Sequence, residues 1–181
     1  MNKSLLITVL WVLLFTSCKT KHHEESSRNT TMPAETSSKM AVDTTPKITG
    51  IGGIFFLSED ATATVDWYRE NLGLVTDVYG AVFETRNAIH PTEPNYARLS
   101  VFDESSDYFQ PSSSDFMINY RVHNLEGLLR KLRKNNVTIL EEIEVYDYGK
   151  FVHILDPEGR KIELWEPVDS VLTALGSPTN K

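Results

Sequence analysis

Residues 116–134 have the sequence FMINYRVHNLEGLLRKLRK, in which a strand pattern passes directly into a helix pattern. The apolar and aromatic residues of 116–122 predict a strand. Asn124 is a typical helix N-cap, and leucines follow at positions 125, 128, 129 and 132, the i, i+3, i+4 and i+7 spacing of one helix face. Basic residues crowd the last turns, where they complement the helix dipole. The stretch therefore predicts a strand followed by an amphipathic helix.

The sequence after this helix predicts three more strands. Residues 156–159, Asp-Pro-Glu-Gly, fit a type I turn between the last two, because proline favours its second position and glycine its fourth. The second half of the chain is therefore expected to have the order β-α-β-β-β. The expected strands lie at 138–145, 150–155 and 161–166.

The first half of the chain repeats this order. A strand pattern leads to Asp60, a plausible N-cap, and Val65, Tyr68 and Leu72 recur at helical spacing before Gly73 ends the helix. Strand patterns follow the helix. The expected strands of this half lie at 48–57, 75–79, 81–86 and 96–102.

The N-terminal residues have the pattern of a targeting signal. Residues 5–15 are almost wholly apolar, but eleven residues are too few for a bilayer span, which needs about 20. The segment ends at Cys18, the sole cysteine, and resembles the lipobox of bacterial lipoproteins, although Phe15 replaces the usual leucine. We therefore expect a lipoprotein signal at 1–17, a lipidated Cys18 on a disordered tether at 18–46, a folded domain at 47–168 and a flexible tail at 169–181.

Charge and cysteine content exclude several classes of function. The chain has a formal net charge of -7, so it offers no basic surface for nucleic acid. One cysteine permits neither an internal disulfide nor a cysteine-based zinc cluster. Phosphate-binding glycine motifs and a nucleophile elbow are also missing from the sequence.

The two halves resemble the vicinal oxygen chelate superfamily, which contains glyoxalase I, extradiol dioxygenases and bleomycin-resistance proteins. The resemblance covers residues 48–167 and rests on four motifs: GIGGI at 50–54 with Asp60 beyond it, WYRENLGL at 67–74, NYRV at 119–122 and DPEGRKIELWEP at 156–167. It implies an α+β fold of two βαβββ modules, whose strands curl into an incomplete barrel around a cleft. Many relatives form dimers, so a homodimer is a further possibility.

The resemblance also implies four positions for metal ligands, which fall here on Gly53, Arg98, Met117 and Glu163. Only Glu163 carries a side chain that suits a hard divalent cation, because glycine has no donor, arginine is a permanent cation and a thioether prefers soft ions. A catalytic metal normally keeps three protein ligands. We therefore expect no cofactor, unless Glu163 recruits His153 and Glu84 into a rebuilt metal site.

Glu163, Arg98 and His153 are the catalytic candidates. Arg98 and Glu163 are expected to approach each other, either as a structural ion pair or as a site in which Arg98 binds an anion and Glu163 takes a proton. His153 lies in an apolar strand, where a hydrogen-bonded core residue is the simpler interpretation. The predicted cleft is mostly apolar, with extra room at Gly53. Its expected ligand-binding residues are Phe55, Leu57, Met117, Asn119 and Arg121.

These residues leave three functions open. The first is a glyoxalase-like domain that binds, isomerises or cleaves a small molecule without the usual metal, as a lyase, isomerase or dioxygenase-like enzyme. The second is a non-catalytic module that sequesters a small molecule, as bleomycin-resistance proteins do. The third is a structural envelope protein. In each case the lipid anchor would hold the domain at the cell envelope, facing the periplasm or the outside.

Replacing Cys18 by serine tests the anchor. Cells that express the wild-type chain should incorporate a labelled lipid precursor into the protein, and Cys18→Ser should abolish the label because serine offers no thiol for acylation. Fractionation of the same cells should move the protein out of the membrane pellet. Equal labelling or unchanged fractionation of the variant would disprove lipidation at Cys18.

Overall fold

A computed structural model describes residues 43–88 and 90–181. The expected signal at 1–17, the lipidated Cys18 and most of the expected tether lie outside the described residues. Within the described ranges, no helix combines the length and the apolar character needed to cross a membrane.

The first half forms the predicted β-α-β-β-β unit. The Asp60 side chain accepts a hydrogen bond from the backbone N–H of Ala63 at 2.8 Å, which confirms the predicted N-cap. Gly73 ends the helix in the left-handed conformation, with φ 69°. The elements of this module are β1 (Lys47–Ser58), α1 (Ala61–Leu72), β2 (Thr76–Asp77), β3 (Gly80–Arg86) and β4 (Pro94–Asp103).

The second half repeats the unit, with Asn124 capping its helix through a bond from the Gly127 N–H at 2.9 Å. The strand expected at 138–145 is shorter: only 144–146 form a strand, and Ile139 makes an isolated bridge to Ile154. A 3-10 turn precedes the module. The elements are η1 (Asp107–Phe109), β5 (Phe116–His123), α2 (Leu125–Lys134), β6 (Glu144–Tyr146), β7 (Gly149–Leu155), β8 (Lys161–Pro167) and α3 (Asp169–Leu175).

The range 169–181, expected to be a flexible tail, contains a helix and a contact with the sheet edge. Asp169–Leu175 form helix α3, and Asn180 continues the sheet edge by bonding to the backbone of Val75, Val82 and Glu84. Bonds to β3 and to Val75, just before β2, thus attach a segment whose sequence carries no strong helix pattern.

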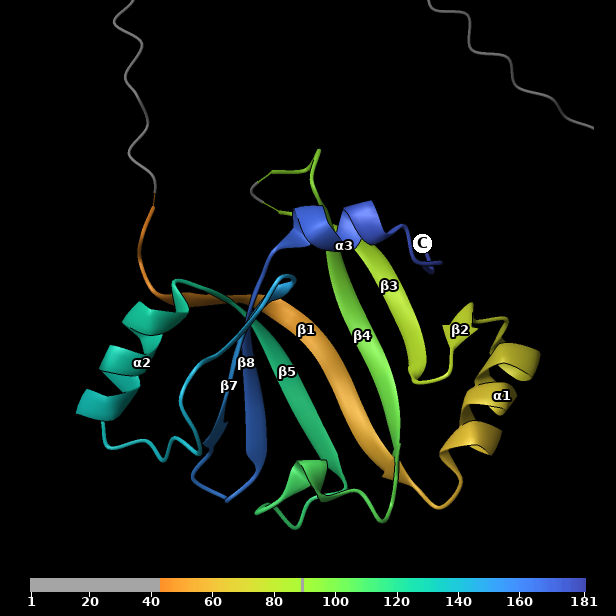
Figure 1. Ribbon diagram of the computed structural model, residues 1–181, viewed down its shortest axis with the longest axis horizontal. Coiled ribbons are helices and arrows are strands. Elements are labelled where there is room, and N and C mark those ends of the chain that lie inside the picture. Colours follow the sequence, from red (N-terminus) through yellow and green to blue (C-terminus); the bar gives the residue numbers. More distant parts are fainter. Residues whose placement is uncertain (1–42, 89) are drawn as a thin grey trace, which may run out of the picture. The chain divides into compact units, whose positions relative to one another are not determined.

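The eight strands form one sheet in the order β2-β3-β4-β1-β5-β8-β7-β6 (Figure 1). β1 and β5 pair antiparallel and join the two modules, while each also pairs in parallel with the last strand of its own module, β4 or β8. Figure 1 shows the sheet strongly curved, with α1 and α2 at opposite flanks and α3 across one end. The predicted α+β fold of two βαβββ modules is confirmed.

The two faces of the second module have different roles. Its outer face packs against α2 in a core that contains Val122, Leu129, Val152 and Leu164. Because side chains alternate across a strand, the neighbouring residues of β5, β7 and β8 point to the opposite, inner face. The predicted leucine stripe of α2 therefore anchors the sheet and leaves the polar residues of the same strands for the inner face.

Truncating this core should destabilise the fold strongly. Leu129 is 1% exposed, and Leu129→Ala in the full-length chain should lower the free energy of unfolding by about 2–5 kcal/mol through lost burial and the cavity left behind. Leu72→Ala is the matched control, because Leu72 is also helical but 58% exposed, and it should change stability by less than about 0.5 kcal/mol. Urea denaturation followed by circular dichroism measures both, and equal effects would contradict this assignment of the core.

Candidate functional site

The inner face centres on the buried carboxylate of Glu163 in β8, which is 3% exposed. Its Oε2 accepts hydrogen bonds from the Tyr108 hydroxyl and, at 3.0 Å, from His153 Nε2, while its Oε1 accepts one from Asn119 Nδ2. Three donors compensate for the loss of water around the charge. Two of them, Asn119 and His153, stand directly opposite Glu163 in the neighbouring strands.

His153 links Glu163 to a second carboxylate. Its Nδ1 lies 2.7 Å from Oε1 of Glu141, and the same oxygen accepts the backbone N–H of His153. An ionised carboxylate can only accept a hydrogen bond. The contacts of Nδ1 with Glu141 and of Nε2 with Glu163 are therefore both hydrogen bonds when each ring nitrogen carries a proton. The side chain of Glu141 is 34% exposed, so this carboxylate–imidazole–carboxylate chain connects the buried Glu163 with solvent.

The surroundings shift the pKa values of Glu163 and Tyr108 in opposite directions. Burial alone would raise the pKa of Glu163, but the hydrogen bonds from His153, Tyr108 and Asn119 outweigh burial and hold it below the usual range. The pKa of Tyr108 is strongly raised by burial and by the adjacent negative charge of Glu163. At neutral pH the pair is therefore a carboxylate that accepts a hydrogen bond from a neutral phenol.

Lys161, also on β8, closes the other side of Tyr108. Its Nζ donates to the Tyr108 carbonyl oxygen at 2.6 Å and lies 5.0 Å from the centre of the phenol ring. Burial lowers the pKa of Lys161, against the opposing charges of Glu141, Glu163 and Asp107. Lys161 thus fixes the η1 segment that brings Tyr108 to Glu163.

The apolar half of the predicted cleft is filled. Phe55 and Met117 pack with Phe109 of η1, and Leu57 lies against this cluster. The room expected at Gly53 is absent, because a Cβ there would lie 2.6 Å from the Phe55 ring. Residues from the β4–β5 connection therefore occupy the space that the sequence assigned to a ligand.

Arg98 lies apart from Glu163, contrary to expectation. Its guanidinium makes a two-oxygen ion pair with Asp77 at 2.7 and 2.9 Å, and its Nε donates to Ser100 Oγ. No hydrogen bond or ion pair joins Arg98 to Glu163 within residues 43–88 and 90–181. The reason is the strand order: β4 and β8 are separated by β1 and β5, so three strand spacings of about 4.8 Å lie between the two backbones.

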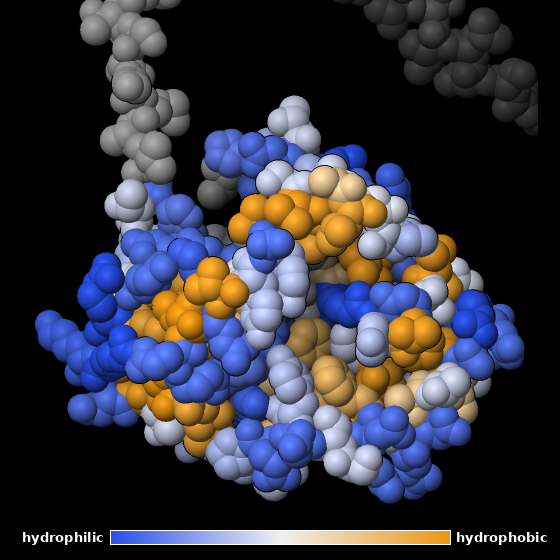
Figure 2. Space-filling view, in the orientation of Figure 1, coloured by the Kyte–Doolittle hydropathy of each residue, from blue (hydrophilic) through white to orange (hydrophobic). Residues whose placement is uncertain are grey.

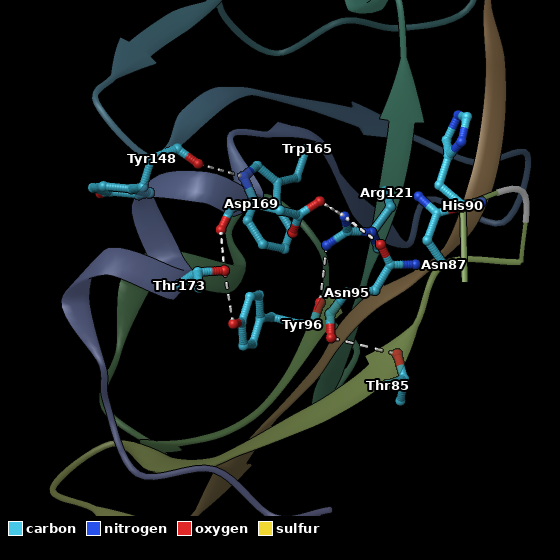
Figure 3. Close-up of polar contacts among 10 residues, drawn as sticks. All are labelled: Thr85, Asn87, His90, Asn95, Tyr96, Arg121, Tyr148, Trp165, Asp169 and Thr173. Atoms are coloured by element: carbon cyan, nitrogen blue, oxygen red, sulfur yellow. Dashed lines mark hydrogen bonds and ion pairs between the residues drawn. The ribbon is translucent and has the colours of Figure 1, made fainter. Parts of the chain in front are cut away.

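Arg121, predicted to bind a ligand, is held by the chain itself at the α3 end of the inner face (Figure 3). It is 5% exposed and forms an ion pair with Asp169 at 2.5 Å. Its remaining bonds go to the Tyr96 carbonyl oxygen at 3.0 Å and to Asn95 Oδ1 at 3.3 Å, and its guanidinium lies 5.1 Å from the centre of the Trp165 ring.

The residues present do not fit the divalent metal that the resemblance implies. Of the four ligand positions only Glu163 has an oxygen donor, and both of its oxygens already accept hydrogen bonds. Glu84, the partner considered for a rebuilt site, instead pairs with Arg86 at 3.6 Å and Lys181 at 3.5 Å. In the described part of the chain no three His, Cys, Asp or Glu side chains form a metal-binding group.

The sequence interpretation missed four residues of the inner face: Tyr108, Glu141, Lys161 and Asp169. Lys161 was detectable, because strand alternation places it on the same face as Glu163. The others lie in connections or in the C-terminal segment, where no periodicity indicates a direction. Of the three predicted catalytic residues, the fold brings Glu163 and His153 together and leaves Arg98 outside.

Comparisons with known sequences and solved structures find related proteins. The sequence model of the Glyoxalase/Bleomycin resistance protein/Dioxygenase superfamily matches residues 50–164, well over half of the chain. No curated protein matches significantly. One similar solved structure is methylmalonyl-CoA epimerase from Mycobacterium tuberculosis, with 22% sequence identity and a TM-score of 0.47; the match covers 70% of this chain and 93% of that chain. Another is a glyoxalase/bleomycin resistance protein/dioxygenase superfamily member from Vibrio splendidus 12B01, with 14% sequence identity and a TM-score of 0.40; the match covers 67% of this chain and 99% of that chain.

The buried carboxylate should make stability depend on pH. Glu163→Gln in the full-length chain should lower the free energy of unfolding at pH 7 by about 2 kcal/mol, because charge-assisted hydrogen bonds are lost in a buried site. An unfolded glutamate titrates near pH ~4.3, and the folded pKa is lower, so the stabilisation by Glu163 is complete above that pH and is lost as the pH falls below it.

The difference in free energy of unfolding between wild type and Glu163→Gln should therefore become smaller as the pH falls from 5 to 3. Urea denaturation at each pH measures it. Glu142→Gln is the control, since the Glu142 side chain is 89% exposed in its ion pair with Arg133. A gap that stays constant or widens on acidification would refute the assignment of a stabilising charge to Glu163.

Proposed function

Because the chain belongs to the Glyoxalase/Bleomycin resistance protein/Dioxygenase superfamily, we propose that it binds a small molecule on its inner face and transfers a proton through Glu163. One observation carries this proposal: a buried carboxylate is joined through His153 to the partly exposed Glu141. A buried base needs a route by which its proton equilibrates with solvent, and this chain of three titratable side chains supplies one.

The chemistry proceeds as a proton transfer and its reversal. Glu163 takes a proton from an acidic C–H or O–H of the bound compound and becomes a carboxylic acid. The electron pair stays on the compound as an enolate or alkoxide. Glu163 then returns this proton, or one that it has exchanged with solvent through His153 and Glu141, to a different atom or face of the compound. This restores the carboxylate and completes an isomerisation without any change of oxidation state.

Tyr108 marks the place of the substrate. Its hydroxyl occupies one acceptor position on Glu163 Oε2, and its carbonyl oxygen is held by Lys161. A compound that replaces this hydroxyl gains direct access to the base. Tyr108 comes from the η1 segment rather than from the sheet, so its side chain can turn away from Glu163 without breaking the ladder of β5 and β8.

No step of this mechanism uses a metal. The metal-ligand positions of the family hold Gly53, Arg98 and Met117 here, and these residues do not suit a divalent cation. The charge of a developing anion would be stabilised by hydrogen bonds and by the Lys161 ammonium instead. We propose that no metal takes part in the reaction.

The proposal extends to the location of the domain. The apolar run at 5–15 and the sole cysteine at position 18 support a lipid anchor in the cell envelope. The folded domain would then meet compounds in the periplasm or outside the cell. Homodimer formation remains a prediction from the family resemblance.

Sequestration without catalysis is the second candidate function. It is favoured by the aromatic content of the inner face. The Phe102 and Tyr108 rings stack with their centroids 5.2 Å apart, and Phe109 packs edge-on against both. A binding module would depend on this aromatic wall and would tolerate loss of the Glu163 charge. The two functions thus differ in their response to Glu163→Gln.

Deuterium exchange in D₂O tests proton transfer without knowledge of the natural substrate. A panel of 2-oxo acids, 2-hydroxycarbonyl compounds and thioesters is incubated with the full-length protein, with and without EDTA, and deuterium incorporation is followed by NMR. Wild type should catalyse exchange of at least one compound, and Glu163→Gln should slow this exchange at least 100-fold, because the amide is not a base.

Glu142→Gln is the matched control, since the Glu142 side chain is 89% exposed in its ion pair with Arg133, and this variant should catalyse exchange at the wild-type rate. Exchange abolished by EDTA, or unchanged in Glu163→Gln, would exclude the proposed mechanism. Binding of a panel compound without exchange, equally tight in wild type and Glu163→Gln, would decide for sequestration. Neither exchange nor binding across the panel would count against both functions.

A further inference from the structure

The ion pair between Arg121 and Asp169 joins a rigid cation to a loosely held helix. Arg121 lies on β5 in the middle of the sheet, whereas Asp169 is the first residue of α3 (Figure 3). The strands alone position the guanidinium, through the Tyr96 carbonyl oxygen, Asn95 Oδ1 and the face of the Trp165 ring. The cation is therefore already oriented before α3 contributes its carboxylate.

Helix α3 is attached mainly by polar contacts. None of its seven residues is buried, and its N-cap, Val168, makes no side-chain hydrogen bond. Besides the ion pair, Thr173 accepts a hydrogen bond from the Tyr96 hydroxyl at 3.0 Å and donates to the Asp169 carbonyl oxygen. Figure 2 shows apolar residues gathered on the exposed side of α3, where Leu175 is 65% exposed. Displacing α3 therefore exposes no fully buried side chain and costs only the partial burial of Val171 and Leu172, while Asn180 can keep its bonds to β3.

The carboxylate of Asp169 is also incompletely satisfied. Its Oδ2 pairs with Arg121, but its Oδ1 is buried and has no hydrogen-bond partner among the described residues. An unpaired buried acceptor weakens the docked state relative to one in which water reaches that oxygen. A carboxylate that filled both positions would compete effectively for Arg121.

We propose that Arg121 is the carboxylate subsite of the inner face, and that Asp169 occupies it as an internal substitute until a ligand displaces α3. The ligand class is a small organic carboxylate with a short apolar body. Its anion would take the place of Asp169 on Arg121, and its body would take the place of the half-buried Val171 and Leu172. The proposal rests on the proposed function, in which the inner face binds a small molecule. It adds that this molecule carries a negative charge.

Benzoate binding to the full-length protein tests the subsite, with benzamide as the uncharged probe of the same shape. Asp169→Asn should bind benzoate at least tenfold more tightly than wild type does, because the internal anion no longer competes. Benzamide should bind with equal affinity to both proteins. Isothermal titration calorimetry at low and at physiological salt measures the affinities.

Asp66→Asn is the matched control, because Asp66 forms an ion pair of the same length, 2.5 Å, with Arg69 on the exposed face of α1. It should bind benzoate as wild type does. The double variant Asp169→Asn with Arg121→Met should lose the gain. Unchanged benzoate affinity in Asp169→Asn, or an equal gain for benzamide, would overturn the subsite. So would self-association of Asp169→Asn through α3 without benzoate binding, measured by sedimentation.

Hydrogen exchange on the wild-type chain provides a measurement that needs no variant to fold. The N–H groups of Val171, Leu172 and Gly176 bond within α3 and its flanks. Their exchange should accelerate with increasing benzoate and not with benzamide, whereas exchange in α2 should stay constant. Unaltered α3 exchange at saturating benzoate would contradict displacement. If no compound exchanges deuterium but benzoate still accelerates hydrogen exchange in α3, the carboxylate subsite is supported and only the proton-transfer function is refuted.

Discussion

The burial of one negative charge, on Glu163, constrains the rest of the inner face. A carboxylate with 3% exposure persists only when donors replace its lost hydration. Here one donor comes from each flanking strand and a third from outside the sheet. Tyr108 must therefore reach the sheet, which draws η1 across the inner face and places Phe109 against Phe55 and Met117. The electrostatic requirement of one side chain thus determines how the apolar half is filled.

The chain's own groups occupy polar positions at both ends of the inner face. Tyr108 meets Glu163 at one end, and Asp169 meets Arg121 at the other. In each pair the sheet supplies the buried, well-oriented member, while a connection or terminal helix supplies its partner. This division places the rigid groups on the strands and their partners outside the sheet. The two partner segments differ in burial: η1 is anchored by the buried Phe109, whereas α3 has no buried residue and is therefore expected to open at a lower free energy.

The sequence predicted the two modules correctly because their patterns are local. The Asn124 cap and the leucine stripe of α2 depend on neighbours within one helix. Strand alternation assigns a side chain to a face, but the register of β5, β7 and β8 places Asn119 and His153 beside Glu163. The prediction that Arg98 and Glu163 approach each other was wrong. It relied on the symmetry of the two motifs and did not take into account that β1 and β5 lie between their strands. Tyr108 and Asp169 escaped prediction because tertiary proximity, rather than local propensity, positions η1 and α3.

The register of the sheet explains why the polar centre belongs to one module. Arg98, Gly53, Asn119, Glu163 and His153 form a continuous row of cross-strand neighbours from β4 to β7. Gly53, which has no side chain, interrupts this row between Arg98 and Asn119, and Arg98 turns to Asp77 in its own module. A metal bound across both modules would need donors on both sides of this gap. Proton transfer needs only the continuous part, Asn119, Glu163 and His153, and this is the part that the chain has kept polar.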